Sequence, residues 1–295
     1  MNRRAFLKQA GLTSALASWA TSLNSNTISE LLTKATEQNQ KLFDLAMAGD
    51  RLALTWLSPW TMIETPDPWQ QQFMAQVARR GRNGIANASR QSGKTEMVAA
   101  IAYLFGCLGR FVLIVSPSDR QSLEFMSKVQ AHHDRLKLGT MASDPNKHEM
   151  MFANGGRVLA LPNSPTKIRG FSAVQLVVFE EAAFIPDAIY NSIRPVIAVS
   201  RGQTVLISSP FGKRGFFYNE WANAPDSWHK VRVSWRDCPR LTPEWLAVER
   251  MRPGMDVEQE YLDCADGDEF KSEVGQYIDW EAHEQLIDGN LQMEW

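Results

Sequence analysis

The segment from residue 88 to residue 95 constrains this chain most, because it has the form of a phosphate-binding loop. It reads Ala-Ser-Arg-Gln-Ser-Gly-Lys-Thr and ends in the required Gly-Lys-Thr, although Ala88 stands where the pattern has its first Gly. A short apolar run precedes the loop and a largely apolar helical stretch follows it, which is the order strand, loop, helix. In such a loop the backbone N–H groups and the helix N-terminus face the phosphates of a nucleotide. We therefore expect nucleotide binding, with Ala88 tolerated if its φ stays negative.

A strand that ends in two acids supplies the second half of such a site. Residues 176–181 read Leu-Val-Val-Phe-Glu-Glu. With Mg-ATP bound, Lys94 reaches the β and γ phosphate oxygens and the Thr95 hydroxyl binds Mg²⁺. Glu180 is then expected to hold Mg²⁺ through water, and Glu181 to orient or deprotonate the attacking water. The usual first acid is Asp, so the longer Glu180 leaves weaker metal binding or a shifted assignment open, and two solvated acids at a strand end are the alternative.

Short apolar runs separated by helical stretches predict the fold class. Runs rich in Val, Ile and Leu are typical of strands that helices cover on both faces. Residues 122–138 carry apolar side chains at near-helical spacing and predict a crossover helix. We expect an α/β, P-loop NTPase fold, with a mostly parallel sheet flanked by helices and an N-terminal helical extension. The predicted strands are 85–88, 111–115, 158–161, 176–179, 205–207 and 231–233.

Composition excludes several other classes of protein. Hydrophobic residues make up 44% of the chain and charged residues 22%, as in an ordinary globular protein. The net charge of -2 gives no global attraction to phosphate, so nucleic-acid contacts must use local basic clusters. Three cysteines lie far apart and five histidines show no zinc-ligand spacing. No apolar run approaches the roughly 20 residues that span a bilayer. Neither a disulfide framework, a structural metal nor a membrane span is expected.

Six stretches, taken together, resemble the ATPase region of bacteriophage terminase large subunits. Taken singly each is weak, but their order along the chain is specific, and the resemblance covers roughly residues 56 to 270. It implies an ATPase motor that couples Mg-ATP hydrolysis to translocation and packaging of double-stranded viral DNA. The stretches are Pro-Trp-Gln at 68–70, Ser-Arg-Gln-Ser-Gly-Lys-Thr at 89–95, Lys-Ile-Arg-Gly at 167–170, Glu-Glu-Ala-Ala-Phe at 180–184, Leu-Ile-Ser-Ser-Pro at 206–210 with Gly-Phe-Phe-Tyr at 215–218, and Val-Glu-Gln-Glu-Tyr-Leu at 257–262.

The resemblance also implies roles for individual residues. Arg90 would be an arginine finger that stabilises charge on the transferring phosphoryl group, and a plain ion pair with a surface acid is the alternative. Gln70 would hydrogen-bond the adenine. Ser208 and Ser209 would sense the γ-phosphate and couple hydrolysis to movement, unless they only end a strand before a turn. The expected catalytic residues are Glu181, Arg90 and Lys94, and the expected nucleotide-binding residues are Gln70, Ser89, Arg90, Gln91, Ser92, Gly93, Lys94 and Thr95.

Three basic clusters are candidates for contacts with DNA: Arg79 and Arg80 with Arg82, Lys167 with Arg169, and Lys213 with Arg214. Lys167 with Arg169, and Lys213 with Arg214, have phenylalanines close by in sequence. Contacts from such residues would go to phosphate and would be insensitive to base sequence, which suits a motor that moves any genome. For any single cluster, a solvated charged face is the alternative.

The family resemblance further implies partners and raises the question of a missing domain. Expected partners are double-stranded DNA, a portal protein, a small terminase subunit and further copies in a ring on the capsid, with no membrane. Terminase large subunits normally carry a nuclease domain after the ATPase, but only a short charged stretch follows residue 262. We expect no nuclease activity, and a truncated prophage product or one half of a split terminase. The alternatives are a helicase-like nucleic-acid ATPase and an inactive remnant.

The N-terminus bears on location and domain boundaries. Asn-Arg-Arg-Ala-Phe-Leu-Lys at 2–8, followed by small and apolar residues, resembles a twin-arginine export signal. Because ATP and genome packaging belong in the cytoplasm, we expect a cytoplasmic protein, with export through the twin-arginine pathway as the alternative. The expected regions are a leader and helical part at 1–50, export-signal-like over 1–25, an ATPase domain at 51–265 and a C-terminal stub at 266–295.

Overall fold

The computed structural model describes residues 66–79, 82–136, 138, 140–164, 171–253, 256–262 and 270. The export-signal-like segment, the predicted N-terminal helical extension and the basic pair Lys167 and Arg169 therefore lie outside the described residues. So does the predicted C-terminal stub, apart from Phe270.

A seven-stranded sheet forms the centre of the described structure, in the order β3-β4-β2-β5-β6-β1-β7. Its neighbouring strands are parallel except for β3 and β4, which pair antiparallel. The prediction of a mostly parallel sheet is confirmed. The strands are β1 (Gly84–Ala88), β2 (Phe111–Ser116), β3 (Glu149–Met151), β4 (Arg157–Pro162), β5 (Leu176–Glu180), β6 (Gln203–Ser208) and β7 (His229–Val233).

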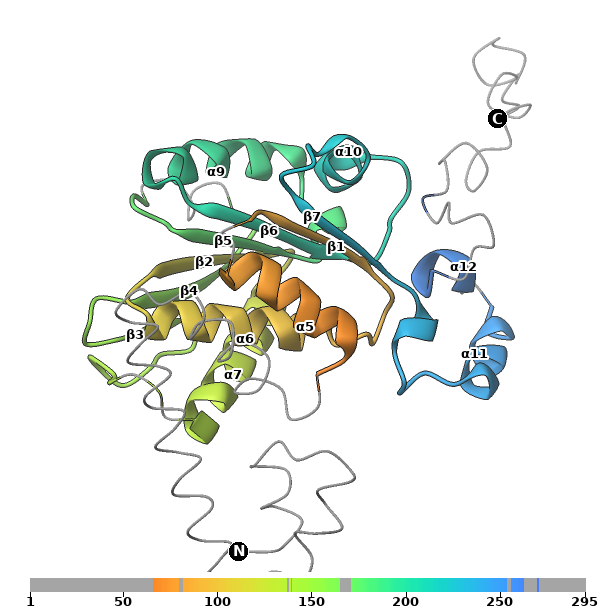
Figure 1. Ribbon diagram of the computed structural model, residues 1–295, viewed down its shortest axis with the longest axis horizontal. Helices are drawn as coiled ribbons and strands as arrows, with labels where there is room; N and C mark the ends of the chain where they lie inside the picture. The colour runs from red at the N-terminus through yellow and green to blue at the C-terminus, as the bar shows by residue number, and fades with distance from the viewer. Residues whose placement is uncertain are drawn as a thin grey trace, which may run out of the picture.

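Two hydrophobic cores lie on opposite faces of this sheet. Along β2, Val112 and Ile114 belong to one core while Leu113 and Val115 belong to the other, as alternation along a strand requires. Figure 1 shows one face covered by α9 (Asp187–Ser200) and α10 (Gly215–Asn223), and the other by three helices. These are α5 (Pro68–Met74), α6 (Lys94–Cys107) and α7 (Asp119–Leu136).

Helix α6 is the central helix, since α5 and α7 both pack against it. From Met97 to Cys107 every one of its residues is buried, so it is apolar on all sides rather than amphipathic. This is the buried helix that the sequence predicts after the phosphate-binding loop. Among the described helices, none combines the length and the apolar character needed to cross a bilayer.

The chain after β7 forms small helices beyond one end of the sheet (Figure 1). A 3-10 turn, η3 (Trp235–Asp237), leads to α11 (Pro243–Arg250) and α12 (Val257–Glu260). Two more short elements lie within the domain, the π-helical turn η1 (Ala75–Arg79) after α5 and the 3-10 turn η2 (Ala182–Phe184) after β5.

Candidate nucleotide site

The loop between β1 and α6 has the backbone of a phosphate-binding loop. Gly93 has a φ of 84°, and a Cβ atom added there would lie 2.8 Å from the Nε2 atom of Gln70, so only glycine fits. Gln91 also has a positive φ of 58°, whereas Ala88 is the last residue of β1 and is not among the residues with positive φ. Alanine at position 88 therefore meets the condition under which it is tolerated. Helix α6 begins at Lys94, and its first N–H groups are free of intrahelical partners.

The first acid, Glu180, is buried at the end of β5. Its side chain accepts a hydrogen bond from Ser116 Oγ at 2.9 Å and another from the Thr95 hydroxyl. Because β2 and β5 are adjacent and parallel, their last residues, Ser116 and Glu180, lie at the same edge of the sheet. Burial raises the pKa of the Glu180 carboxyl, and the two hydroxyls lower it.

Thr95 and Glu180 together fit a magnesium ion that is bound with a nucleotide. Their hydroxyl and carboxylate are hard oxygen ligands, and Mg²⁺ commonly takes one or two protein oxygens and completes its shell with phosphates and water. Within the described ranges, no group of three or more His, Cys, Asp or Glu side chains could hold a metal ion. The Thr95 hydroxyl and the Glu180 carboxylate therefore need phosphate oxygens beside them to complete a metal site.

The second acid, Glu181, faces the loop. Its Oε1 atom lies 3.2 Å from the Nζ atom of Lys94, whose side chain is only 7% exposed. Ser208 Oγ donates to Glu181 Oε2 at 3.3 Å, and the N–H of Ala183 donates to the same hydroxyl at 3.2 Å. Glu181 also has a left-handed backbone, with φ 48° and ψ 50°, which is uncommon for this residue type and typical of functional sites. The first predicted coupling serine therefore contacts the predicted catalytic base directly.

A cavity of about 620 Å³ opens above the loop. Its size is in the range of small-molecule sites. The loop and the start of α6 form its floor, and Glu181 lies beside them. Side chains from α7, from α11 and the residues just after it, and from the residue after α12 complete the wall: Lys128, Trp245, Glu249, Arg252 and Tyr261.

Comparison with known proteins places the chain in a family. The model of the terminase large subunit, T4likevirus-type, N-terminal, matches residues 85–291. The chain belongs to this terminase family. The match includes the phosphate-binding loop, both acids and Ser208, and it continues past the domain boundary that the sequence predicts at residue 265.

Solved structures of large terminases share the fold of this terminase chain. The ATPase domain of the Thermus phage P74-26 large terminase is 21% identical with a TM-score of 0.56, over 67% of this chain and 92% of that one. The large terminase of a thermophilic bacteriophage, in complex with ATP-gamma-S, is 13% identical with a TM-score of 0.53, over 67% and 52% of the two chains. The HK97 bacteriophage large terminase is 14% identical with a TM-score of 0.50, over 77% and 47%. The predicted P-loop NTPase fold is confirmed, and this chain spans about half the length of the last two proteins.

Arg90, which lines the cavity, is paired with the acid Glu260. Its Nε atom lies 3.1 Å from the Oε2 atom of Glu260, and its N–H donates to the backbone oxygen of Glu260. Burial raises the pKa of Glu260, and Arg90 lowers it. The ion pair that is the alternative to the arginine finger is thus present in the terminase structure. The finger role stays a prediction, and it requires Arg90 to leave Glu260 when nucleotide is bound.

Gln70 lies behind the loop and is 2% exposed. Its Oε1 atom accepts from the N–H of Asp67 at 2.8 Å, and its Nε2 atom donates to the backbone oxygen of Gly93 at 3.1 Å. The contact between Gln70 and adenine stays a prediction. What the structure shows is a contact between Gln70 and the phosphate-binding loop itself.

The remaining predicted residues lie at or just after η1, directly after β6, just before α10, or outside the described ranges. Ser209 is buried, directly after β6. Lys213 and Arg214 are exposed just before α10, and the Arg214 guanidinium lies 4.2 Å from the centre of the Phe211 ring. DNA contact by any residue of the three basic clusters stays a prediction.

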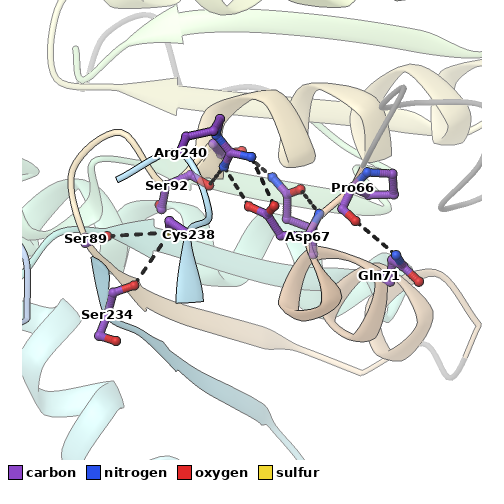
Figure 2. Close-up of polar contacts among 10 residues, drawn as sticks. Pro66, Asp67, Gln71, Ser89, Ser92, Ser234, Cys238 and Arg240 are labelled. Carbon is purple, nitrogen blue, oxygen red and sulfur yellow. Dashed lines mark hydrogen bonds and ion pairs between the residues drawn. The ribbon is translucent and has the colours of Figure 1, made fainter. Parts of the chain in front are cut away.

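Three residues of the site had no role in the sequence analysis: Asp67, Ser116 and Arg240. Figure 2 shows Arg240 directed at Asp67 and at the backbone of Ser92. The spacing of Asp67 and Gln70 is that of a capping box, which marks the start of α5 but not its contact with the loop. No local pattern marks Arg240, because its partners lie far away in the sequence.

The raised pKa of Glu180 predicts a measurable effect on stability. The pKa of the Glu180 carboxyl is higher in the folded protein than in the unfolded chain, where it is about 4.3. As the pH rises from about 4.3 to the folded pKa, such a carboxyl makes the folded protein less stable. In the absence of metal and nucleotide, Glu180→Gln is therefore expected to raise the Tm at pH 7, and the gain should shrink as the pH falls toward about 4.3. Each kcal/mol moves the Tm of a domain of this size by about 2–4 °C.

Thermal unfolding of both proteins in a metal chelator over this pH range provides the measurement. Glu181→Gln is the control, because it removes a carboxylate that is paired with Lys94 and should give no such gain. A Glu180→Gln protein that is no more stable than wild type at pH 7 would contradict the electrostatic cost of burying Glu180.

Proposed function

We propose that this terminase chain hydrolyses Mg-ATP and couples the hydrolysis to translocation of double-stranded viral DNA during packaging. The observation that carries the proposal is the meeting of Lys94 and Thr95, from the start of α6, with Glu180 and Glu181, from the end of β5, at one edge of the sheet. A charged lysine, a metal-binding hydroxyl, a metal-binding acid and a base are the parts that phosphoryl transfer from ATP requires. Solved relatives in complex with ADP and with ATP-gamma-S agree with it.

The chemistry follows from the contacts of these side chains. The triphosphate binds at the N-terminus of α6. Lys94 then leaves its ion pair with Glu181 and contacts the phosphate oxygens. Glu181 is then free to accept a proton from water as the water oxygen bonds to the γ-phosphorus and the bond to the bridging β-γ oxygen breaks. Thr95 and Glu180 would hold Mg²⁺, which would neutralise part of the phosphate charge. ADP and inorganic phosphate are the products, and Arg90 would stabilise charge on the transferring group.

The proposal is tested by the activity of the purified protein. Phosphate release from ATP should require Mg²⁺, should stop on chelation, and should rise with double-stranded DNA. Displacement of one DNA strand would instead favour a helicase-like ATPase. Absence of both turnover and binding of a fluorescent ATP analogue would leave an inactive remnant.

Lys213 and Arg214 are proposed to contact DNA phosphates. They follow β6, the strand that ends at the predicted coupling residue Ser208. Replacing both with alanine should weaken binding of double-stranded DNA, equally for different base sequences. The slope of log affinity against log salt should fall by about 1 per lost phosphate contact. Titrations of labelled duplexes at several salt concentrations measure both effects.

A matched control removes the same charge elsewhere. The pair Lys147→Ala with Arg194→Ala is suitable, because Arg194 also lies over an aromatic ring, that of Tyr190. Equal losses of affinity in the two double variants would show that Lys213 and Arg214 act only through the overall charge of the protein.

We further propose the partners and the location that the family implies. These are a portal protein, a small terminase subunit and a ring of copies on the capsid, all acting in the cytoplasm. Fractionation of cells that express a tagged chain tests the location, since a shortened form outside the inner membrane would show export instead. The absence of nuclease activity stays a prediction, which incubation with plasmid DNA and divalent metal would test.

A further inference from the structure

A forked ion pair joins two segments that contact the phosphate-binding loop. The two terminal nitrogens of Arg240 lie 3.0 and 2.6 Å from the two carboxylate oxygens of Asp67 (Figure 2). Asp67 immediately precedes α5 and is 5% exposed, whereas Arg240 lies between η3 and α11 with about half of its side chain exposed. A bidentate pair of this kind fixes the plane of the guanidinium as well as its position.

Each peptide of a phosphate-binding loop has an N–H group that faces the ligand and a carbonyl that points the opposite way. Carbonyls that turn away from the ligand need donors of their own when they are buried. The backbone oxygen of Ser92 accepts from Arg240 at 3.1 Å, and that of Gly93 accepts from Gln70 Nε2 at 3.1 Å. These two peptide groups carry the N–H groups of Gly93 and Lys94. Arg240 thus helps to set the direction of the Gly93 N–H, and Gln70, together with the N–H of Met97, which donates to the same Gly93 oxygen, that of the Lys94 N–H.

Asp67 holds both donors. Its carboxylate binds Arg240, and its own N–H donates to the Oε1 atom of Gln70 at 2.8 Å. The same stretch of chain that carries Arg240 also contacts the loop at Cys238, whose Sγ lies 3.9 Å from Ser89 Oγ. The loop is therefore supported from behind by two segments that meet at Asp67.

We propose that Asp67 and Arg240 are positioning residues that, through Ser92 and Gln70, hold the phosphate-binding loop in its binding-competent form before nucleotide arrives. Support of this kind has a physical reason, because the positive φ angles of Gln91 and Gly93 make the conformation costly for Gln91 and easily lost at Gly93. The inference rests on the proposed nucleotide site, but the apo structure of the loop can be measured independently of it.

Two conservative variants separate positioning from simple charge attraction. Arg240→Lys keeps the positive charge but loses the planar fork, so it cannot bind both oxygens of Asp67 and reach Ser92 together. Asp67→Asn keeps the shape of the side chain but releases Arg240. If Arg240 only attracted phosphates, Arg240→Lys would bind nucleotide normally and Asp67→Asn would bind it more tightly.

Under the proposal, each variant should bind a fluorescent ADP analogue about tenfold more weakly than wild type, which corresponds to ~1.4 kcal/mol. The double variant should bind little more weakly than either single variant, because both changes remove the same support. In the nucleotide-free protein, amide hydrogen exchange should become faster over residues 91–95 but not in β2. Arg157→Lys is the control, since it alters an arginine-carboxylate pair with Glu149 between β3 and β4, away from the loop.

The outcomes distinguish failure of this inference from failure of the proposed function. Wild-type affinity and wild-type exchange in both variants would overturn it, as would tighter binding in Asp67→Asn. Equal weakening in Arg157→Lys would make the effect a general loss of stability and would also overturn it. If the wild-type protein binds no nucleotide, the proposed function fails, and hydrogen exchange still decides whether Asp67 and Arg240 order the loop.

Discussion

Replacing Glu181 with glutamine is expected to stop ATP turnover while nucleotide binding survives. Glutamine has the shape of Glu181 but cannot accept a proton from the attacking water, and loss of a general base typically costs about 10²–10⁴ in rate. In the resting site Glu181 pairs with Lys94 at 3.2 Å. Without that pairing Lys94 is fully available to phosphate, so the Kd for ATP should be unchanged or lower. Phosphate release gives kcat, and a fluorescent ATP analogue gives the Kd.

Another acid on the wall of the same cavity is the matched control. Glu249 is 3% exposed and pairs with Arg252 in the same part of the chain, so Glu249→Gln also removes a buried carboxylate. It should keep turnover within a few-fold of wild type. If Glu181→Gln retains turnover while Glu180→Gln loses it with Mg²⁺ still bound, the base is Glu180 and the two acids exchange roles.

The second large effect is expected from Lys94→Ala, which should lose both binding and turnover. The variant lacks the cation that contacts the phosphates, and it also leaves Glu181 unpaired and facing them. Truncating one partner of such a buried charge pair costs ~2–5 kcal/mol, much of it from the charge left behind. Binding of the analogue should therefore be weaker than the loss of one contact would explain.

The double variant Lys94→Ala with Glu181→Gln isolates that second contribution. It should bind nucleotide more tightly than Lys94→Ala alone, although neither protein should hydrolyse ATP. Lys128→Ala is the control, because Lys128 lines the same cavity from α7, where its ammonium pairs with Glu124 at 3.7 Å. Equal affinities for Lys94→Ala and the double variant would show that repulsion from Glu181 contributes nothing.

The strands could be predicted closely from the sequence, because parallel strands that are buried on both faces appear as continuous apolar runs. The predicted run 176–179 is β5 (Leu176–Glu180), and 205–207 lies inside β6 (Gln203–Ser208). The short strand β3 (Glu149–Met151) was missed, since it has only three residues and pairs antiparallel at the edge of the sheet. The order of the strands could not be predicted, because it depends on crossovers that leave no local pattern.

The candidate site divides in the same way. Lys94, Thr95, Glu180 and Glu181 belong to contiguous motifs whose residue types follow from the chemistry of phosphate and metal, so the sequence predicts them. The residues that hold these motifs in place belong to no contiguous motif, so the sequence does not predict them. Arg240 contacts Asp67 across 173 positions of the chain, and Ser116 contacts Glu180 across 64. Such partners are known only once the fold brings them together.

The place of β1 in the sheet sets the order in which a newly made chain can complete this domain. Among the strands of the described residues, β1 is the first to be synthesised, and its two neighbours, β6 and β7, are the last. A nascent chain therefore carries β1 with both edges unpaired until residue 208 has left the ribosome, and with one edge unpaired until residue 233 has followed. Its loop lacks Arg240 for slightly longer. Unpaired strand edges make such chains prone to aggregation, and long-range pairing is slow to form. Nucleotide is not expected to stabilise a partly synthesised chain, because the segment that carries Arg240 and contacts the binding loop is made after β7.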